Sequence, residues 1–122
     1  DLNLEFTARR ESYEEIGLPI QNGKCIGNLS PVLIPVSEFR VTPYIFVHKI
    51  FPKLIRNQRE VDEIIKCRLS DIDTHTKKTF QDVEAKAGLT LKKVPGIKLK
   101  GHFIWGATAL IIHELNCIMK TL

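Results

Sequence analysis

Apolar positions near the start of the chain repeat at the spacing of a helix. At about 100° per residue three of them fall on one side: Phe6, Tyr13 and Ile16. This pattern predicts a helix over residues 4–16. Gly17 favours an end directly after it, because glycine readily takes the left-handed conformation past a helix, and Pro19 cannot continue the helix.

The next part of the chain has the composition of strands. Residues 25–36 and 40–51 are rich in β-branched and aromatic side chains, which predicts two strands joined at Ser37 and Glu38. Prolines within these stretches imply bends, edges or loops; they are Pro31, Pro35 and Pro43.

The remainder again mixes helix and strand signals. In chain order we expect a short helix over 59–66, a turn capped by Ser70, a loop over 71–88, strands over 90–94 and 97–100 separated by Pro95 and Gly96, and a closing helix over about 105–120. No linker or repeat divides these elements, so we expect one domain of the α/β or α+β class over residues 1–122.

Composition narrows the class of protein. The 122 residues are 43% hydrophobic and 26% charged, which is typical of a globular domain and argues against disorder. The longest apolar run, residues 104–112, is far shorter than the roughly 18 residues of a membrane span, so we expect no membrane insertion. Three cysteines without paired spacing predict reduced thiols and favour the cytoplasm; they are Cys25, Cys67 and Cys117.

Charge is distributed unevenly along the chain. The first 20 residues carry a net charge of −3, from Asp1, Glu5, Glu11, Glu14 and Glu15 against Arg9 and Arg10, so the total of +4 leaves +7 for the rest. An acidic head on a basic body suits a site where a divalent cation meets an anionic substrate, but ordinary surface charge explains these totals as well. The charge distribution alone therefore does not distinguish a binding site from ordinary surface charge.

The acidic side of the first helix carries candidate chemistry. Glu11 and Glu15 are four residues apart and lie one above the other, with Glu14 beside them. Three carboxylates this close repel one another unless a cation lies between them, and Mg²⁺ prefers such oxygen ligands. Arg10 is placed to orient one glutamate through a bidentate pair. Three glutamates alone more often form a solvated acidic face.

The complete string from Arg10 to Leu18 is more specific. It resembles the second half of the Nudix box, whose consensus ends R-E-U-x-E-E-x-G-U with U a bulky aliphatic residue. The matching residues are Arg10, Glu11, Glu14, Glu15, Gly17 and Leu18, and Ser12 departs from the first aliphatic position.

Further segments resemble the coenzyme A diphosphatase branch of the Nudix hydrolases. The spacing from Asp1 to the Thr7–Glu11 run looks like the pattern of that branch, and similarity continues through residues 29–39, 60–71 and 101–109. The front half of the box, with its glycine-rich loop, would precede Asp1, and we expect the front of the natural protein to be missing. If these residues were the whole polypeptide, we would expect weak stability or rescue by a partner chain.

The resemblance implies a fold and an activity. The fold would be a Nudix α/β/α sandwich with a mixed sheet, whose first strands and glycine-rich loop are absent from this chain. The activity would be hydrolysis of a diphosphate bond, with coenzyme A or acyl-coenzyme A giving 3′,5′-ADP and 4′-phosphopantetheine or its acylated form. Glu11 and Glu15 would be the main ligands of Mg²⁺ or Mn²⁺, Glu14 an additional ligand, and Arg10 would orient the acidic side chains.

Alternatives stay open for the substrate and for catalysis itself. ADP-ribose or a dinucleotide could replace coenzyme A, and a non-catalytic nucleotide-binding module is a rival from another class. Members of the family are often dimers, so a homodimer is possible, and we expect neither a nucleic-acid nor a membrane partner.

Several other residues carry weaker expectations. Glu60 and Glu63 lie where some Nudix enzymes supply an extra carboxylate, although an exposed acidic helix is the simpler interpretation. For Ser37 and Phe39 we favour a turn and core packing over a place in the substrate pocket.

Histidines and lysines complete the candidates. His102 and Trp105 resemble a family motif, with Trp105 expected as a core anchor for the last helix. No ligand spacing links the other histidines, His48, His75 and His113, and we assign them no chemistry. A lysine cluster is expected to form a solvated strand face rather than a phosphate or nucleic-acid site; it comprises Lys92, Lys93, Lys98 and Lys100.

Overall fold

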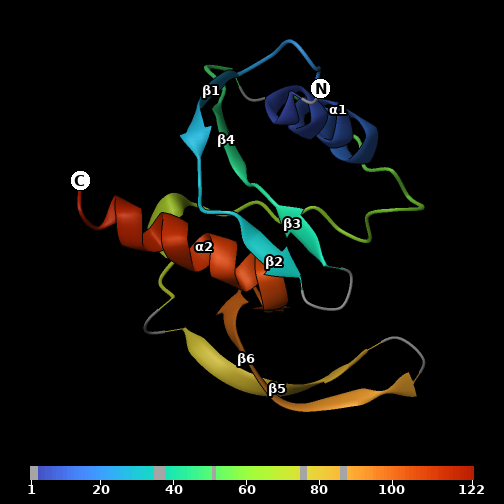
Figure 1. Ribbon diagram of the computed structural model, residues 1–122, viewed down its shortest axis with the longest axis vertical. Coiled ribbons are helices and arrows are strands. Elements are labelled where there is room, and N and C mark those ends of the chain that lie inside the picture. The colour runs from blue at the N-terminus through green and yellow to red at the C-terminus, as the bar shows by residue number, and fades with distance from the viewer. Residues whose placement is uncertain (1–2, 35–37, 51, 75–76, 86–87) are drawn as a thin grey trace. The chain divides into compact units, whose positions relative to one another are not determined.

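The computed structural model describes residues 3–34, 38–50, 52–74, 77–85 and 88–122 (Figure 1). The elements are α1 (Leu4–Ile16), β1 (Lys24–Asn28), β2 (Val32–Ile34), β3 (Phe39–Val41), β4 (Tyr44–Val47), the 3₁₀ turn η1 (Leu69–Asp71), β5 (Lys78–Glu84), β6 (Thr90–Leu99), β7 (His102–Trp105) and α2 (Gly106–Met119). They fall into two compact units, residues 1–31 with 41–66 and residues 32–40 with 67–122. The mixture of helices and antiparallel strands is consistent with a Nudix-like fold.

Helix α1 of the first unit has the bounds predicted from the sequence. The side chain of Asn3 accepts a hydrogen bond from the Phe6 N–H at 3.0 Å and caps the first turn. At the other end Gly17 takes a left-handed conformation, φ 77°, and its N–H donates to the Tyr13 carbonyl at 3.0 Å. Both ends therefore follow from local chemistry.

The first unit also contains an antiparallel pair of strands, β1 and β4. Cys25 lies opposite Phe46, and a bulge between Cys25 and Gly27 shifts the register. The Leu29 N–H donates to the Pro43 carbonyl at 2.9 Å and continues the pairing beyond the strands. Leu29, 5% exposed, is buried directly after β1.

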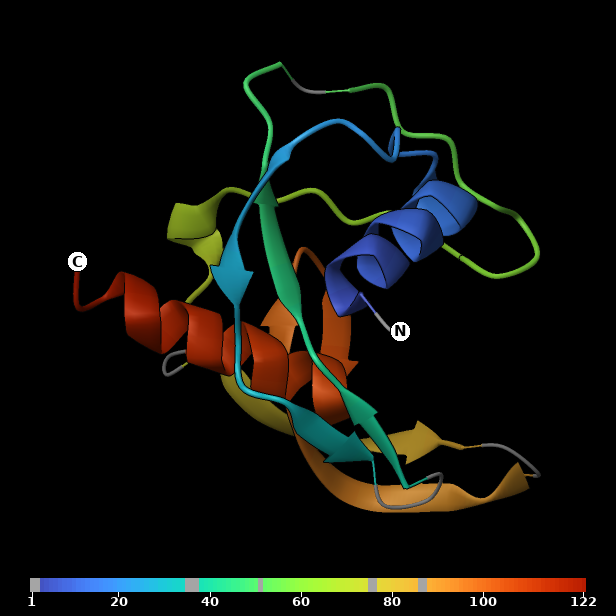
Figure 2. The ribbon, with the colours of Figure 1, turned by 45° about the horizontal axis from the view of Figure 1, so that its top comes forward.

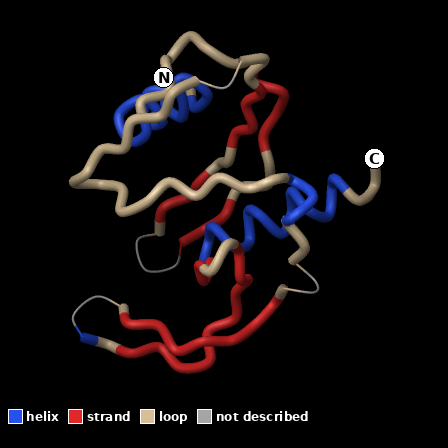
Figure 3. Tube along the Cα trace, turned by 180° about the vertical axis from the view of Figure 1, so that it is seen from behind, coloured by secondary structure: helices blue, strands red, loops and turns tan. Residues whose placement is uncertain are grey.

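The second unit is built on the sheet β5–β6–β7, in which both neighbouring pairs are antiparallel (Figure 3). Helix α2 contacts β6, β7 and β2 (Figure 2). On β6, the apolar side chains of Ile97 and Leu99 are buried in the second unit. Neither α1 nor α2 is long and apolar enough to cross a membrane, among the residues described.

Prolines divide the predicted strands as expected. The stretch 25–36 forms β1 and β2 with Pro31 between them, and the stretch 40–51 forms β3 and β4 with Pro43 between them. Pro35, Ser37 and the end of the first stretch lie outside the described residues.

The predicted break at Pro95 and Gly96 is wrong, because β6 runs through both residues. Pro95 lies opposite Phe80 of β5, while the pairing with β7 starts only at Gly96, so proline stands where β6 has one neighbour. At Gly96 an added Cβ would lie 2.4 Å from the Ile104 carbonyl oxygen, so glycine allows the close approach of β7.

Three expectations in the middle of the chain are also wrong. Residues 59–66 contain turns and no helix, and Ser70 lies inside η1, whose preceding residue Arg68 provides no side-chain cap. Residues 78–84 of the expected loop 71–88 form β5, whose alternating burial is typical of a strand with one side against the protein and the other toward solvent.

Candidate functional site

The candidate acidic face lies at the carboxyl end of α1. Glu11, Glu14 and Glu15 are all exposed, and Glu14 and Glu15 belong to the last turn, which contains no basic residue. The carbonyl end of a helix carries partial negative charge, so carboxylates are unfavourable there. The sequence therefore concentrates negative charge where helix electrostatics oppose it.

Both burial and crowding act on the pKa of the Glu15 carboxyl. Desolvation raises the pKa of its carboxyl first, and the negative charges of Glu11, Glu60 and Glu14 raise it further. Glu60 comes from the segment after β4, so the acidic face includes a carboxylate from a second part of the first unit.

Arg10 contacts one of the three helix glutamates. Its Nη1 donates to both carboxylate oxygens of Glu14, at 3.0 and 3.1 Å. A single nitrogen makes both bonds, so this is not the two-nitrogen fork that gives the strongest arginine pairs. Among the described residues no basic side chain pairs with Glu11 or Glu15, which leaves their charge uncompensated.

The segment after β4 is attached to the end of α1 by main-chain hydrogen bonds. The Ile55 N–H donates to the Ile16 carbonyl and the Asn57 N–H to the Glu15 carbonyl, each at 2.8 Å. The Asn57 side chain donates to the Glu14 carbonyl at 3.3 Å. Carbonyls at a helix end have no partner within the helix, so this segment satisfies them.

Asn57 also orders the turn that carries Glu60. Its Nδ2 lies 3.4 Å from a Glu60 carboxylate oxygen, and its Oδ1 accepts from the Arg59 N–H at 3.0 Å. Its main-chain carbonyl accepts from the N–H groups of Glu60 and Val61. One asparagine thus joins the end of α1 to the turn of Glu60, a role that the sequence did not reveal.

The donor set fits a hard divalent cation by its chemistry, since carboxylate oxygens are the ligands of Mg²⁺ and Mn²⁺. In the part of the chain that the structure describes, no three His, Cys, Asp or Glu side chains are gathered closely enough to hold a metal ion. Ligation by Glu11, Glu14 and Glu15 therefore requires their side chains to rotate together, which their exposure permits.

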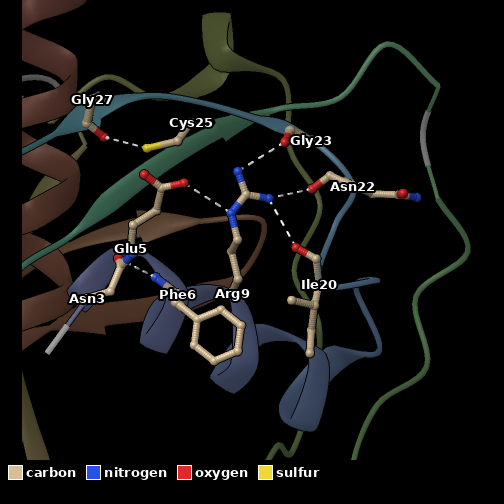
Figure 4. A network of polar contacts seen from close by, with 9 residues as sticks. All are labelled: Asn3, Glu5, Phe6, Arg9, Ile20, Asn22, Gly23, Cys25 and Gly27. Atoms are coloured by element: carbon tan, nitrogen blue, oxygen red, sulfur yellow. Dashed lines mark hydrogen bonds and ion pairs between the residues drawn. The ribbon is translucent and has the colours of Figure 1, made fainter. Parts of the chain in front are cut away.

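Arg9, next to the acidic face, anchors α1 to the following loop (Figure 4). Its guanidinium donates to the carbonyls of Ile20, Asn22 and Gly23 at 3.1, 3.0 and 3.2 Å, and its Nε donates to Glu5 at 3.2 Å. The guanidinium carbon lies 4.6 Å from the centroid of the Phe46 ring, as in a cation–π contact. The spacing from Glu5 to Arg9 signals the ion pair, but no sequence pattern indicates the three carbonyl partners.

The other candidates have diverse positions. Phe39 on β3 is 70% exposed, so the expected core packing is wrong for this residue. Trp105, the last residue of β7, is 39% exposed and borders a cavity, so the expectation of a core anchor is wrong. His48 lies against Gly23, Glu63 is exposed, and Ser37 and His75 fall outside the described residues.

Comparison with known proteins gives related sequences. No family model and no solved structure matches the chain. The chain is 33% identical over 115 residues to "Uncharacterized Nudix hydrolase NudL" of Pectobacterium atrosepticum and 31% identical over 115 residues to the NudL of Photorhabdus laumondii. These matches cover 94% of the chain and 58% and 60% of the relatives. "Nudix hydrolase 3" of Caenorhabditis elegans is 26% identical over 130 residues, covering 93% of the chain and 53% of that protein.

These matches support a relationship between this chain and the Nudix hydrolase family. All three relatives are named as Nudix hydrolases. The chain spans between half and two thirds of the length of these relatives.

Proposed function

We propose that this chain is part of a metal-dependent Nudix hydrolase that cleaves the diphosphate bond of coenzyme A or acyl-coenzyme A. The products would be 3′,5′-ADP and 4′-phosphopantetheine or its acylated form. The observation that carries the proposal is the negative charge at the end of α1, where no basic side chain of the described residues pairs with Glu11 or Glu15. Desolvation and then the neighbouring carboxylates raise the pKa of Glu15 there. The Nudix hydrolase relatives support reading this charge as a cation site rather than as a solvated face.

In this proposal Glu11 and Glu15 would hold Mg²⁺ or Mn²⁺ and Glu14 would be a further ligand. The bound ion would neutralise charge on the diphosphate oxygens and lower the pKa of a water ligand. Arg10, which contacts both carboxylate oxygens of Glu14, would orient that side chain. Glu60, whose carboxylate contacts the Asn57 side chain at 3.4 Å and raises the pKa of Glu15, would accept a proton from the attacking water or add a ligand.

The coenzyme A substrate is supported by the resemblance of residues 29–39, 60–71 and 101–109 to that branch. We place the protein in the cytoplasm, which suits its three free thiols. We further propose that the protein acts on a small-molecule substrate and forms a homodimer, and that it binds neither nucleic acid nor a membrane.

A substrate panel tests the proposal on the full-length protein. With Mg²⁺ present, we expect release of 3′,5′-ADP from coenzyme A and much slower hydrolysis of ADP-ribose and dinucleotides. Hydrolysis of ADP-ribose alone would keep the diphosphate chemistry and reject the substrate. Nucleotide binding without hydrolysis of any of these compounds would favour the non-catalytic module.

Replacing Asn57 by alanine tests the attachment of the Glu60 turn. We expect kcat to fall about tenfold, because groups that orient a metal site from outside typically contribute 10- to 100-fold. The main-chain bonds from Ile55 and Asn57 to α1 remain, so the free energy of unfolding should fall by only about 1 kcal/mol.

The matched control is Asn28→Ala. The Asn28 side chain donates to the Leu29 carbonyl at 3.1 Å and lies on β1, away from the acidic residues in sequence. Steady-state kinetics with coenzyme A should separate the two variants. Equal kcat values for Asn57→Ala and Asn28→Ala would contradict a positioning role for Asn57.

A further inference from the structure

The sheet β5–β6–β7 carries a basic depression at the end where β5 begins and β6 turns into β7. Its volume of about 450 Å³ lies within the range of small-molecule sites, roughly 300–1,000 Å³. All of its residues belong to the second unit. They are Lys77, Lys78, Thr79, Lys98, Lys100 and Gly101.

Strand register decides which of these lysines share one face of the sheet. The Lys98 N–H donates to the Lys77 carbonyl at 3.1 Å, which extends the β5–β6 register by one residue and sets these two lysines opposite each other. Thr79, two residues after Lys77, lies on the same face. Lys78 lies opposite Ile97 on the other face. The charge of the depression therefore comes from Lys77 and Lys98, with Lys100 in the turn that follows.

This arrangement is unfavourable for the protein alone. Like charges directly opposite each other on neighbouring strands are destabilising. Among the residues that the structure describes, no carboxylate forms an ion pair with Lys77, Lys98 or Lys100. Lys77 Nζ donates to the Asp71 carbonyl at 3.0 Å, and its ammonium has further donors for another partner. The three ammonium groups together favour an anion in the depression.

The turn between β6 and β7 adds the third positive charge in an unfavourable backbone conformation. Lys100 has φ 49° and Gly101 has φ 79°, so both residues are left-handed. Glycine, asparagine and aspartate are the usual residues in such a turn, because most other side chains are strained there. Lysine at this position keeps a cation at the edge of the depression, where the usual turn residues would supply none.

We propose that the depression binds a small multivalent oxyanion that contains a diphosphate group. Several negative charges in a small volume match three ammonium groups, and lysine binds phosphate as a point charge. Lys92 and Lys93 of β6 do not line the depression, so its charge is local and does not follow the track that binding along a nucleic-acid strand uses. The site requires neither a metal ion nor hydrolysis, so it goes beyond the proposed activity and is tested independently of it.

Inorganic diphosphate is the probe, titrated calorimetrically into the full-length protein in EDTA. Without a metal ion the carboxylates of α1 repel an anion, so the acidic face does not contribute to the binding. We expect saturable binding that weakens as salt is added. Acetate should bind at least about tenfold more weakly, because it offers a single charge to three ammonium groups. Equal affinities for acetate and diphosphate would reject a site for a multivalent anion.

Two pairs of variants locate the anion, and every variant removes one positive charge. Lys98→Gln should weaken diphosphate binding about tenfold. Its control is Lys92→Gln, at an exposed lysine of the same strand outside the depression, which should leave the affinity unchanged. Lys100→Asn should cause a similar loss, and its control is Lys93→Asn, because Lys93 also has a positive φ, 52°, and does not line the depression. Asparagine tolerates this conformation, and circular dichroism verifies that each variant folds.

ADP distinguishes the two sources of a diphosphate group. Tighter binding of ADP than of inorganic diphosphate, lost in Lys98→Gln, would identify a nucleotide, whereas equal or weaker binding would identify the inorganic anion. Absence of diphosphate binding, or equal affinities of Lys98→Gln and Lys92→Gln, would overturn the proposal. Tighter binding of a single-stranded oligonucleotide that both variants weaken would assign these lysines to nucleic acid and also overturn it.

Discussion

Replacing Glu15 by glutamine is expected to lower kcat for diphosphate hydrolysis by about 100-fold or more while the fold is retained. A glutamine keeps the size of the side chain and removes the charge with which Glu15 would hold the metal ion. Loss of one such electrostatic group commonly reduces rates by 10²–10³. Mg²⁺-dependent release of 3′,5′-ADP from coenzyme A measures the effect.

The same substitution should slightly stabilise the protein at neutral pH. The pKa of Glu15 is raised, so its folded form binds more protons than its unfolded form, and stability falls as pH rises through that pKa. Glu15→Gln removes this cost, and its advantage in urea unfolding without metal should shrink as the pH approaches the ordinary pKa of glutamate. Opposite changes in activity and stability are typical of a functional site.

Glu84→Gln is the control, because Glu84 is an exposed glutamate on β5. It should change neither kcat nor stability appreciably, since isolated surface substitutions have small effects. Full turnover in Glu15→Gln would contradict the site assignment and return the end of α1 to a solvated acidic face.

Arg9→Ala is expected to lower the free energy of unfolding by about 2 kcal/mol. Alanine removes the donors to three loop carbonyls and the ion pair with Glu5, and it uncovers the Phe46 ring. Arg9→Lys should recover little of the loss, because one ammonium cannot reproduce the planar arrangement of donors. Urea unfolding of the full-length protein measures both variants.

Arg10→Ala provides the matched comparison on the same helix. Its contact with Glu14 is exposed, with side chains 45% and 50% accessible, and exposed pairs contribute about 1 kcal/mol or less. The loss of stability in Arg9→Ala should therefore clearly exceed that in Arg10→Ala. Equal losses would show that the network around Arg9 contributes no more than a surface ion pair.

Helix α1 was predictable because its determinants are local. A repeat of apolar positions and Gly17 define it without any tertiary information. The continuity of strand β6 was not predictable, because Pro95 is tolerated only where β7 does not yet pair with β6. Strand β5 was not predictable either, because it depends on its pairing with β6. Local patterns lose their predictive value where pairing partners decide the conformation.

The candidate site was predictable to a similar extent. One helical repeat places Glu11, Glu14 and Glu15 together, and their spacing is visible in the sequence. The role of Asn57 was not visible, because it joins α1 to a turn more than 40 residues later through main-chain groups. Glu60 was a candidate by resemblance, and the structure adds its electrostatic influence on Glu15.

Binding of Mn²⁺, followed by the electron paramagnetic resonance signal of the free ion, tests the central claim most directly. It needs no substrate and reports on the acidic face of α1 alone when variants are compared. We expect the full-length protein to take up Mn²⁺ and the folded double variant Glu11→Gln/Glu15→Gln to lose that uptake. Equal uptake by the two proteins, or none by the unmodified protein, would contradict a metal site at the end of α1.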